Sequence, residues 1–187
     1  MKNKLLENEN LSLRTPEPED LEFLYEWEND TDVWKYGAAI SPYSKFILRQ
    51  YIEDAQTDIF QSKQLRFMIV LHQNKTVIGT IDLYDFDAIN SRCGIGIYID
   101  KKWREKSFAM QALNILEKYA FSFLKINQLY AVIPTNNKAS LLLFKNSEFL
   151  QTGVLEQWIS TENEYEDAII VQKLNPENNE RRYKKSI

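Results

Sequence analysis

A strand, a long helix and a second strand follow one another in the second half of the chain, and this unit limits the possible folds most. Residues 92–100 place isoleucines and glycines on opposite faces, as expected for a strand. Residues 107–124 carry an apolar stripe at helical spacing that begins at Phe108 and ends at Phe123. Residues 128–133 form the next strand. Two strands joined by such a helix predict a crossover connection within a mixed α/β fold.

Shorter periodic segments on either side complete the pattern. Strands are predicted at residues 11–14, 65–71, 75–83, 149–158 and 167–173, and helices after Pro18, Pro42 and Asn137. The order β-α-α-β-β-β-α-β-α-β-β predicts a largely antiparallel sheet that contains one crossover. Five glycines and five prolines mark no linker. We therefore expect a single domain over residues 1–174 and a polar tail over residues 175–187.

Charge and cysteine content argue against several classes of function. A net charge of −4 disfavours a non-specific nucleic-acid binder, which is usually basic. No apolar run approaches the ~20 residues of a membrane helix, and the first ten residues lack the apolar core of a signal peptide. The one cysteine, Cys93, cannot form a disulfide within the chain, and with His72 it makes no recognisable metal cluster. We expect a cytoplasmic protein without metal, membrane or nucleic-acid partners.

The loop before the long helix reads WREKSFA over residues 103–109. This segment resembles the GNAT acetyltransferases, in which an aromatic residue and Arg-Gly-x-Gly-x-Ala open a helix. Glu105 and Ser107 stand where the family has glycines. Backbone N–H groups at a helix start bind phosphate, and Ser107 is expected to donate a hydrogen bond or to cap the helix. The resemblance implies that acetyl-CoA binds here, through Ile97, Tyr98, Ile99, Arg104, Lys106, Ser107, Phe108 and Ala109.

A second segment, which starts at Asn137, is similar to the family's Asn-x-x-Ser/Ala-x-x-x-Tyr-x-x-x-Gly-Phe. Asn137 and Ser140 match, Phe144 replaces the tyrosine and Glu148 replaces the glycine. In the family, the Asn and the small residue contact the pantetheine arm of the cofactor, and the tyrosine lies near the thioester sulfur. The resemblance therefore implies that Asn137, Ser140 and Phe144 contact acetyl-CoA.

A third segment, GTIDLY over residues 79–84, matches the family strand that precedes the cofactor strand. With these three segments in order, the resemblance extends over residues 11–174, and it is greatest to the branch of ribosomal-protein alanine and spermidine acetyltransferases. It implies the GNAT fold, which is an α/β fold with a mostly antiparallel central sheet of about seven strands and helices on both faces.

The implied reaction is direct attack of a primary amine on the acetyl thioester. The amine must lose a proton because its pKa is near ~10.4, and the oxyanion needs a fixed donor. The family takes that donor from the cofactor strand, here the N–H of Tyr98, Ile97 or Ile99. The usual tyrosine acid and glutamate base are missing, because Phe144 and Gly94 occupy their positions. We therefore predict a mechanism dominated by positioning.

Other side chains are candidates for the missing acid and base. Asp82, Asp85 and Glu28 are the candidate bases, and Tyr98 or Tyr84 is the candidate acid. The aspartates are equally consistent with solvated carboxylates at a strand end.

The acceptor site is expected near the first two helices. Its candidate residues are Glu28, Trp34, Tyr36, Tyr43 and Tyr84, although core packing explains the aromatic ones as well.

The chain is thus interpreted as an N-acetyltransferase that acts on a small molecule, a polyamine or a protein N-terminus. The alternative is a degenerate acyl-CoA-binding sensor or binding module without turnover. Apolar residues between 149 and 158 are compatible with a homodimer, and core packing explains them as well.

Overall fold

The computed structural model describes residues 5–34, 41–55, 57–161 and 164–178. The strands are β1 (Leu11–Arg14), β2 (Leu65–Leu71), β3 (Val77–Asp87), β4 (Arg92–Ile99), β5 (Gln128–Pro134), β6 (Leu150–Ser160) and β7 (Tyr165–Leu174). The α-helices are α1 (Leu21–Glu28), α2 (Thr31–Trp34), α3 (Lys45–Asp54), α4 (Ile59–Ser62), α5 (Phe108–Lys118) and α6 (Lys138–Asn146). The short helices α2 and α4 were not predicted; the predicted order of the longer elements is confirmed.

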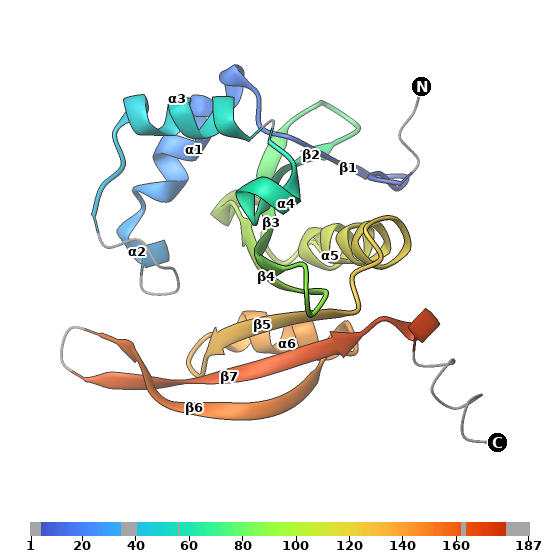
Figure 1. The fold of residues 1–187 in the computed structure, drawn as a ribbon. Helices are drawn as coiled ribbons and strands as arrows, with labels where there is room; N and C mark the ends of the chain where they lie inside the picture. Colours follow the sequence, from blue (N-terminus) through green and yellow to red (C-terminus); the bar gives the residue numbers. More distant parts are fainter. Residues whose placement is uncertain (1–4, 35–40, 56, 162–163, 179–187) are drawn as a thin grey trace.

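The strands form one seven-stranded sheet in the order β1-β2-β3-β4-β5-β7-β6 (Figure 1). Five of the six neighbouring pairs are antiparallel, and only β4 and β5 are parallel. The predicted fold class is therefore confirmed, including the mostly antiparallel sheet and the single crossover.

Two apolar clusters place helices on both faces of the sheet. The larger cluster packs α5 and α6 against residues from most strands, and Leu116 and Ile81 are completely buried in it. The smaller one packs α1 and α3 against β2 and β3, around Leu24 and Met68. The alternation along β2 and β3 explains both clusters, because successive side chains of a strand point to opposite faces.

The long helix changes character before its predicted end. α5 is followed by a π-helix, Tyr119–Phe123, in which the N–H of Leu124 donates to the carbonyl of Tyr119 at 3.1 Å. A wider turn rotates later side chains away from the α-helical stripe. Phe123, predicted to end that stripe, is therefore 63% exposed and stacks on Tyr119 instead.

The packed chain continues past Leu174, where the polar tail was expected to begin. Asn175 is 2% exposed, and its amide donates to the carbonyls of Phe121 and Ile126 at 3.2 and 3.0 Å. The basic end of the tail, residues 181–185, lies outside the described residues.

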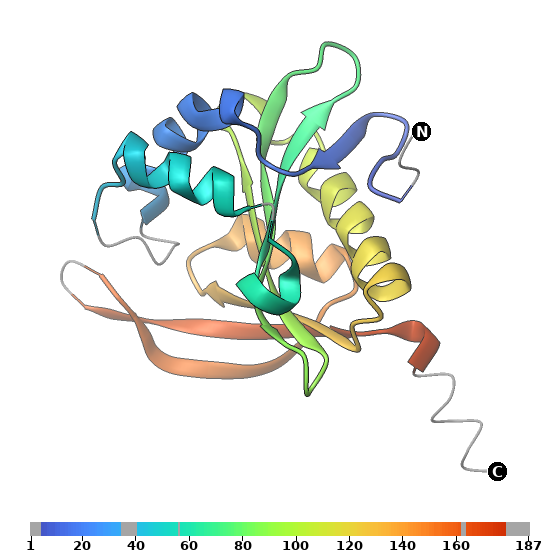
Figure 2. The same cartoon turned by 45° about the horizontal axis from the view of Figure 1, so that its top comes forward.

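The parallel pairing of β4 and β5 is short. It consists of Arg92↔Gln128, Cys93↔Leu129 and Gly94↔Tyr130. Beyond Gly94 the two strands run apart, which is visible in both ribbon views (Figures 1 and 2). Within the described ranges, the facing edges of β4 and β5 thus have no strand partner over their second halves, and this gap positions the candidate site.

Candidate active site

Beyond Gly94, the edge of β4 that faces the gap has no strand partner among the described residues. The N–H of Asp100, just after β4, donates to the carbonyl of Ile78 in β3 at 2.9 Å. Because antiparallel bonds alternate, the backbone of Tyr98 also points to β3, whereas Ile97 and Ile99 point to the gap. Of the three predicted oxyanion donors, Ile97 and Ile99 are therefore placed to serve, and the N–H of Tyr98 is not.

The start of α5 lies next to the end of β4. Ser107 is the N-cap residue, with φ 59°, and its side chain does not cap the helix. The expected side-chain cap is therefore absent from the described part of the chain, and donation from Ser107 to the cofactor stays a prediction. The first N–H with a helical partner is that of Gln111, which donates to Ser107 at 3.2 Å. The N–H groups of Phe108 and Ala109 precede it and remain available to an anion.

The two basic residues of this loop have different environments. Arg104 donates from Nε to the carbonyl of Ile99 at 2.9 Å, and its guanidinium carbon lies 5.8 Å from the centre of the Tyr98 ring. Lys106 donates to the carbonyl of Lys102 at 3.2 Å and lies 4.8 Å from the centre of the Trp103 ring. Arg104 is therefore held at the end of β4 beside the gap, and Lys106 is turned toward the loop itself.

Three residues in this region adopt a left-handed backbone without being glycine. They are Glu105, Ser107 and Glu148, with φ of 61°, 59° and 63°. Each stands where the GNAT pattern has a glycine. The left-handed conformation costs an L-residue about 1–2 kcal/mol. These positions therefore keep the left-handed backbone conformation that glycine adopts easily, although other residues occupy them.

The start of α6 is on the other side of the gap. The Oδ1 atom of Asn137 accepts a hydrogen bond from the N–H of Ser140 at 3.1 Å, so Asn137 caps the helix. Its amide nitrogen is not used for that bond. Phe144 is 3% exposed and packs edge-on against Phe149 with ring centroids 4.9 Å apart. It lies in the main core, and its contact with a cofactor stays a prediction.

On the opposite face of the sheet, two of the three candidate bases, Asp82 and Glu28, are paired to one arginine, whereas Asp85 is exposed. Arg66, Asp82 and Gly96 lie side by side on β2, β3 and β4. Nε and Nη2 of Arg66 contact the two carboxylate oxygens of Asp82 at 2.8 and 3.0 Å. Its Nη1 atom donates to Glu28 of α1. Sequence reasoning missed Arg66, although a single arginine in an otherwise apolar strand signals a need for carboxylate partners.

The two glycines of β4 have different surroundings. A Cβ atom at Gly94 would lie 2.4 Å from Cε2 of Tyr84, so the Tyr84 ring covers the position where relatives have glutamate. A Cβ atom at Gly96 would lie 3.7 Å from Oδ2 of Asp82 and 3.9 Å from Cδ1 of Tyr84. Gly96 is therefore half-buried between a carboxylate and an aromatic ring, with room for a Cβ atom at ordinary contact distances.

Tyr84 reaches across β4 toward β5. Its ring lies edge-on to that of Tyr130, with centroids 6.2 Å apart. Burial, followed by Tyr130, raises the pKa of Tyr84 to about 12, and the backbone of Val132 acts in the opposite direction. The phenol is therefore neutral at ordinary pH and lies near the point where β4 and β5 part. Burial also raises the pKa of Tyr98, whose ring packs 5.3 Å from that of Trp27.

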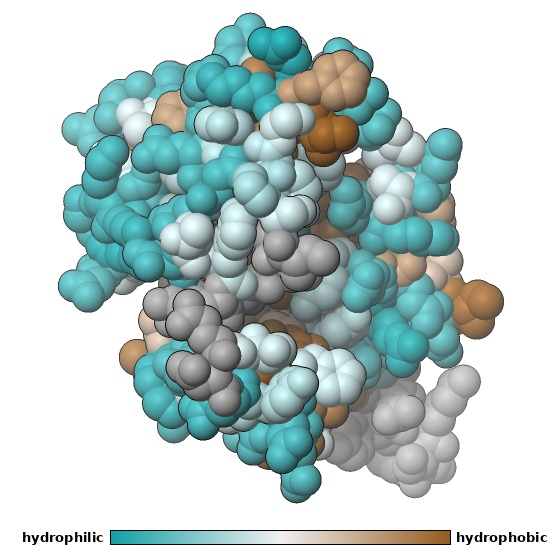
Figure 3. Space-filling model, turned by 90° about the vertical axis from the view of Figure 1, so that its left-hand side faces the viewer, coloured by the Kyte–Doolittle hydropathy of each residue, from teal (hydrophilic) through white to brown (hydrophobic). Residues whose placement is uncertain are grey.

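The other predicted acceptor residues surround the end of α1. Trp34 donates from its indole to the carbonyl of Glu28 at 2.7 Å. Tyr43 is 39% exposed, and its backbone is held by Asn29. Tyr36 lies outside the described residues. This side of the molecule is largely hydrophilic and is hollowed between its upper and lower parts, where apolar surface shows (Figure 3).

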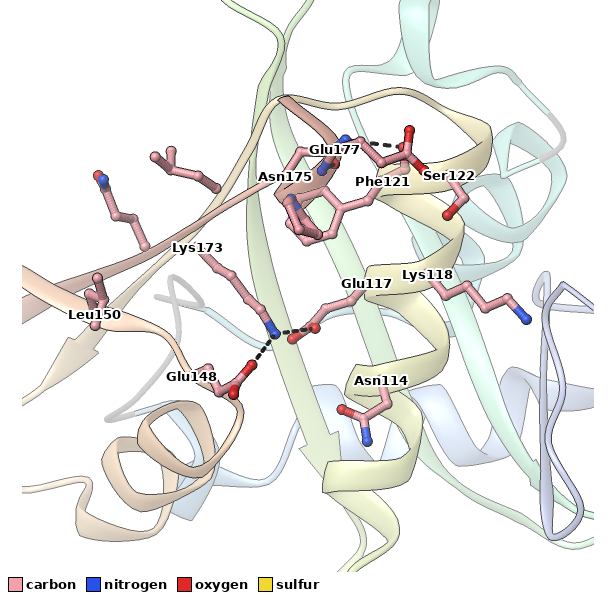
Figure 4. Close-up of a pocket in the computed structure, with 13 residues that line it drawn as sticks. Asn114, Glu117, Lys118, Phe121, Ser122, Glu148, Leu150, Lys173, Asn175 and Glu177 are labelled. Carbon is pink, nitrogen blue, oxygen red and sulfur yellow. Dashed lines mark hydrogen bonds and ion pairs between the residues drawn. The ribbon is translucent and has the colours of Figure 1, made fainter. Parts of the chain in front are cut away.

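A separate groove of about 830 Å³ lies between α5 and β7 (Figure 4). Its lining includes Glu117 and Lys173 and none of the predicted site residues.

The thiol of Cys93 is fully buried, and burial raises its pKa to about 12. In the described ranges, no three His, Cys, Asp or Glu side chains are placed to hold a metal ion. No described helix has the length and apolar character needed to cross a membrane.

Comparison with known proteins identifies the family. The profile of the acetyltransferase (GNAT) domain matches residues 10–149. The uncharacterized N-acetyltransferase YoaA of Bacillus subtilis (strain 168) is 30% identical over 159 residues, which cover 83% of this chain and 88% of that protein. Spermidine N(1)-acetyltransferase of Escherichia coli (strain K12) is 23% identical over 85% of this chain and 83% of that protein.

A solved structure shares the fold. The crystal structure of spermidine N-acetyltransferase from Vibrio cholerae in complex with CoA and spermine superposes with a TM-score of 0.81, at 24% identity, over 90% of this chain and 97% of that one. The matched region contains the crossover loop and all of α6, which lie on the two sides of the gap. The chain therefore belongs to the GNAT acetyltransferases, which transfer an acetyl group from acetyl-CoA to an amine.

Proposed function

We propose that acetyl-CoA binds in the gap between β4 and β5 and that a cationic primary amine reaches it over Gly96. The observation that carries the proposal is the space beside Asp82 at Gly96, next to a strand edge that has no partner among the described residues. When bound, acetyl-CoA supplies the acetyl group as a thioester. The N–H groups that open α5, together with Arg104, suit its pyrophosphate because they present positive charge at a helix start.

The gap also offers groups for the cofactor arm and for the developing oxyanion. The backbone of β4 can pair with the amides of pantetheine, and Asn137 can donate from its amide nitrogen while Oδ1 caps α6. The N–H of Ile97 is the proposed oxyanion donor, because it points into the gap one residue from Gly96. Each of these groups is held by regular secondary structure, which favours catalysis by positioning.

The chain segment that contains α1 is rich in carboxylates, several of which are ion-paired. Residues 17–32 contain eight Asp or Glu residues and no Lys or Arg. Asp82 lies beside Gly96 and is placed to orient an ammonium or amine nitrogen, while Arg66 holds that carboxylate in position. Tyr84 is placed to donate a hydrogen bond from its neutral phenol near the end of the gap. The amine proton then leaves through water or Asp82, since Gly94 offers no carboxylate at the usual base position.

The acceptor is proposed to be a small primary amine or polyamine. The Vibrio cholerae protein of similar fold was crystallised with CoA and spermine. A protein N-terminus is a further candidate of the same chemistry. A cytoplasmic location is proposed from the single cysteine, which is free and buried.

A homodimer is proposed through the edge strand β6. The outer side chains of this strand are exposed rather than packed in the core: Leu150 is 71%, Val154 50% and Trp158 60% exposed. Exposed apolar groups on an edge strand favour association with another chain. Measurement of the oligomeric state by light scattering tests this proposal, and a monomer at all concentrations would contradict it.

The proposed activity is tested by calorimetric titration with acetyl-CoA and by release of CoA thiol in the presence of primary amines. We expect saturable binding and amine-dependent release. Absence of binding would contradict the proposal. Binding without release across mono-, di- and polyamines would favour the alternative, an acyl-CoA-binding module without turnover.

A further inference from the structure

Arg66 holds the two acidic groups of the proposed acceptor site in one network. It binds Asp82 through two nitrogens and Glu28 through the third. Its guanidinium carbon also lies 5.2 Å from the centre of the Tyr51 ring, and its side chain is only 20% exposed. Every nitrogen of the guanidinium is therefore committed, and the arginine is held against α1, α3 and β3 at once.

This network fixes the charge next to Gly96. Glu28 and Asp82 contribute two negative charges and Arg66 one positive charge, so the group carries a net charge of −1. Oδ2 of Asp82 lies 3.7 Å from the Cβ position at Gly96 and accepts from Arg66 at 3.0 Å. An ammonium placed over Gly96 would thus meet the Asp82 carboxylate first, with the guanidinium directly behind it.

We infer that Arg66 is a specificity-determining residue, which lowers the preference of the acceptor site for amines that carry a second positive charge near the reacting nitrogen. The inference rests on the proposed function. A second ammonium close to the first meets a site in which one of two carboxylates is already neutralised. Without Arg66 the same site would carry a charge of −2 and would favour a dication. One such charge near a protein surface changes binding by about tenfold or more.

The test compares two amines that differ by one ammonium group, 1-aminobutane and 1,4-diaminobutane. The measured quantity is the ratio of kcat/KM for the diamine to kcat/KM for the monoamine. General damage to the fold lowers both values and leaves their ratio unchanged, whereas a change of site charge moves the ratio. We expect Arg66→Met to raise the ratio about tenfold and Arg66→Lys, which keeps the charge, to leave it within about twofold.

Two further variants complete the design. Arg49→Met removes an exposed arginine from α3 and should leave the ratio unchanged. Glu28→Gln removes one carboxylate but keeps the Arg66–Asp82 pair, so it should lower the ratio about tenfold. This variant decides the question if Arg66→Met does not fold.

The outcomes separate the inference from the function on which it rests. If the unaltered protein releases no CoA with either amine, the proposed function is contradicted and the inference with it. If the unaltered protein is active and the ratio stays within twofold in both Arg66→Met and Glu28→Gln, only the inference is overturned. A shift as large in Arg49→Met would also overturn it, because the effect would then be one of overall charge.

Discussion

At the scale of single residues, the replaced glycines are the most informative feature. Glu105 and Ser107 keep a left-handed backbone at the start of α5, and Glu148 does so after α6. All nine residues with positive φ among the described ones are residues other than glycine. The loop shape is therefore imposed by its surroundings, namely the end of β4 and the helix that follows, and not by the local preference of the residues.

Ser107→Gly should stabilise the protein, because glycine adopts this conformation without steric cost. We expect the free energy of unfolding to rise by about 0.5–1 kcal/mol, since part of the gain is offset by the greater freedom of glycine in the unfolded chain. Urea unfolding measures this change. The matched control is Ser122→Gly in the helical segment after α5, which should lower the free energy of unfolding by about 0.5 kcal/mol. Equal effects of the two substitutions would contradict the prediction.

At the scale of elements, β4 combines two glycines with different roles. Gly94 makes room for the ring of Tyr84, whereas Gly96 leaves space for a small group beside Asp82. The missing glutamate of the family is thus explained by packing, because any side chain at position 94 would collide with Tyr84.

Gly94→Ala should therefore reduce stability, and Gly96→Ala should reduce activity. The first places a Cβ atom 2.4 Å from a ring carbon and should cost about 1–3 kcal/mol in the free energy of unfolding. The second makes only ordinary contacts, so stability should change by less than about 0.5 kcal/mol. It fills the proposed amine position, and kcat/KM for the amine should fall about tenfold or more. Unfolding curves measure the change in stability, and steady-state rates measure the change in kcat/KM. A Gly96→Ala variant of full activity would contradict the proposed acceptor position.

The elements themselves were largely predictable, since periodicity and proline positions mark β4, α5 and β5 in the sequence. The π-helix at Tyr119–Phe123 was not, because a widened turn leaves no trace in the apolar pattern. The site was predicted residue by residue and not as an arrangement. Glu28 and Asp82 were each named as candidates, but only strand register and helix packing bring them together on Arg66.

At the scale of the whole molecule, the two halves of the sheet share only a short parallel pairing between β4 and β5. A second connection crosses the groove between α5 and β7. Lys173 contacts Glu117 at 2.7 Å and the carbonyl of Ser147 at 2.9 Å, as Figure 4 shows for the carboxylate. One oxygen of Glu117 is buried without a hydrogen-bond partner among the described residues. Burial therefore outweighs the pairing with Lys173 and raises the pKa of Glu117.

The raised pKa predicts a pH dependence of stability. The folded protein binds the Glu117 proton more tightly than the unfolded chain, whose glutamates titrate near ~4.3. The contribution of this proton is complete below that value and is lost as the pH rises through the folded pKa. The free energy of unfolding should thus fall relative to that of Glu117→Gln over this range.

Urea unfolding at a series of pH values measures the difference between the two proteins. Lys173→Met, which removes the group that lowers the pKa of Glu117, should move the loss to higher pH. Parallel curves for the unaltered protein and Glu117→Gln would show that Glu117 does not titrate in this way.

The position of Cys93 in the short pairing of β4 with β5 has a practical consequence. Its sulfur is enclosed and donates to the carbonyl of Tyr84 at 3.1 Å, and its neighbour across the strand pair is Leu129. A thiol in this place reacts with an alkylating reagent only while the two halves of the sheet separate, since only the exposed thiolate is nucleophilic. The alkylation rate of this single thiol therefore reports how often the two halves of the sheet separate. A ligand that contacts both halves should lower that rate.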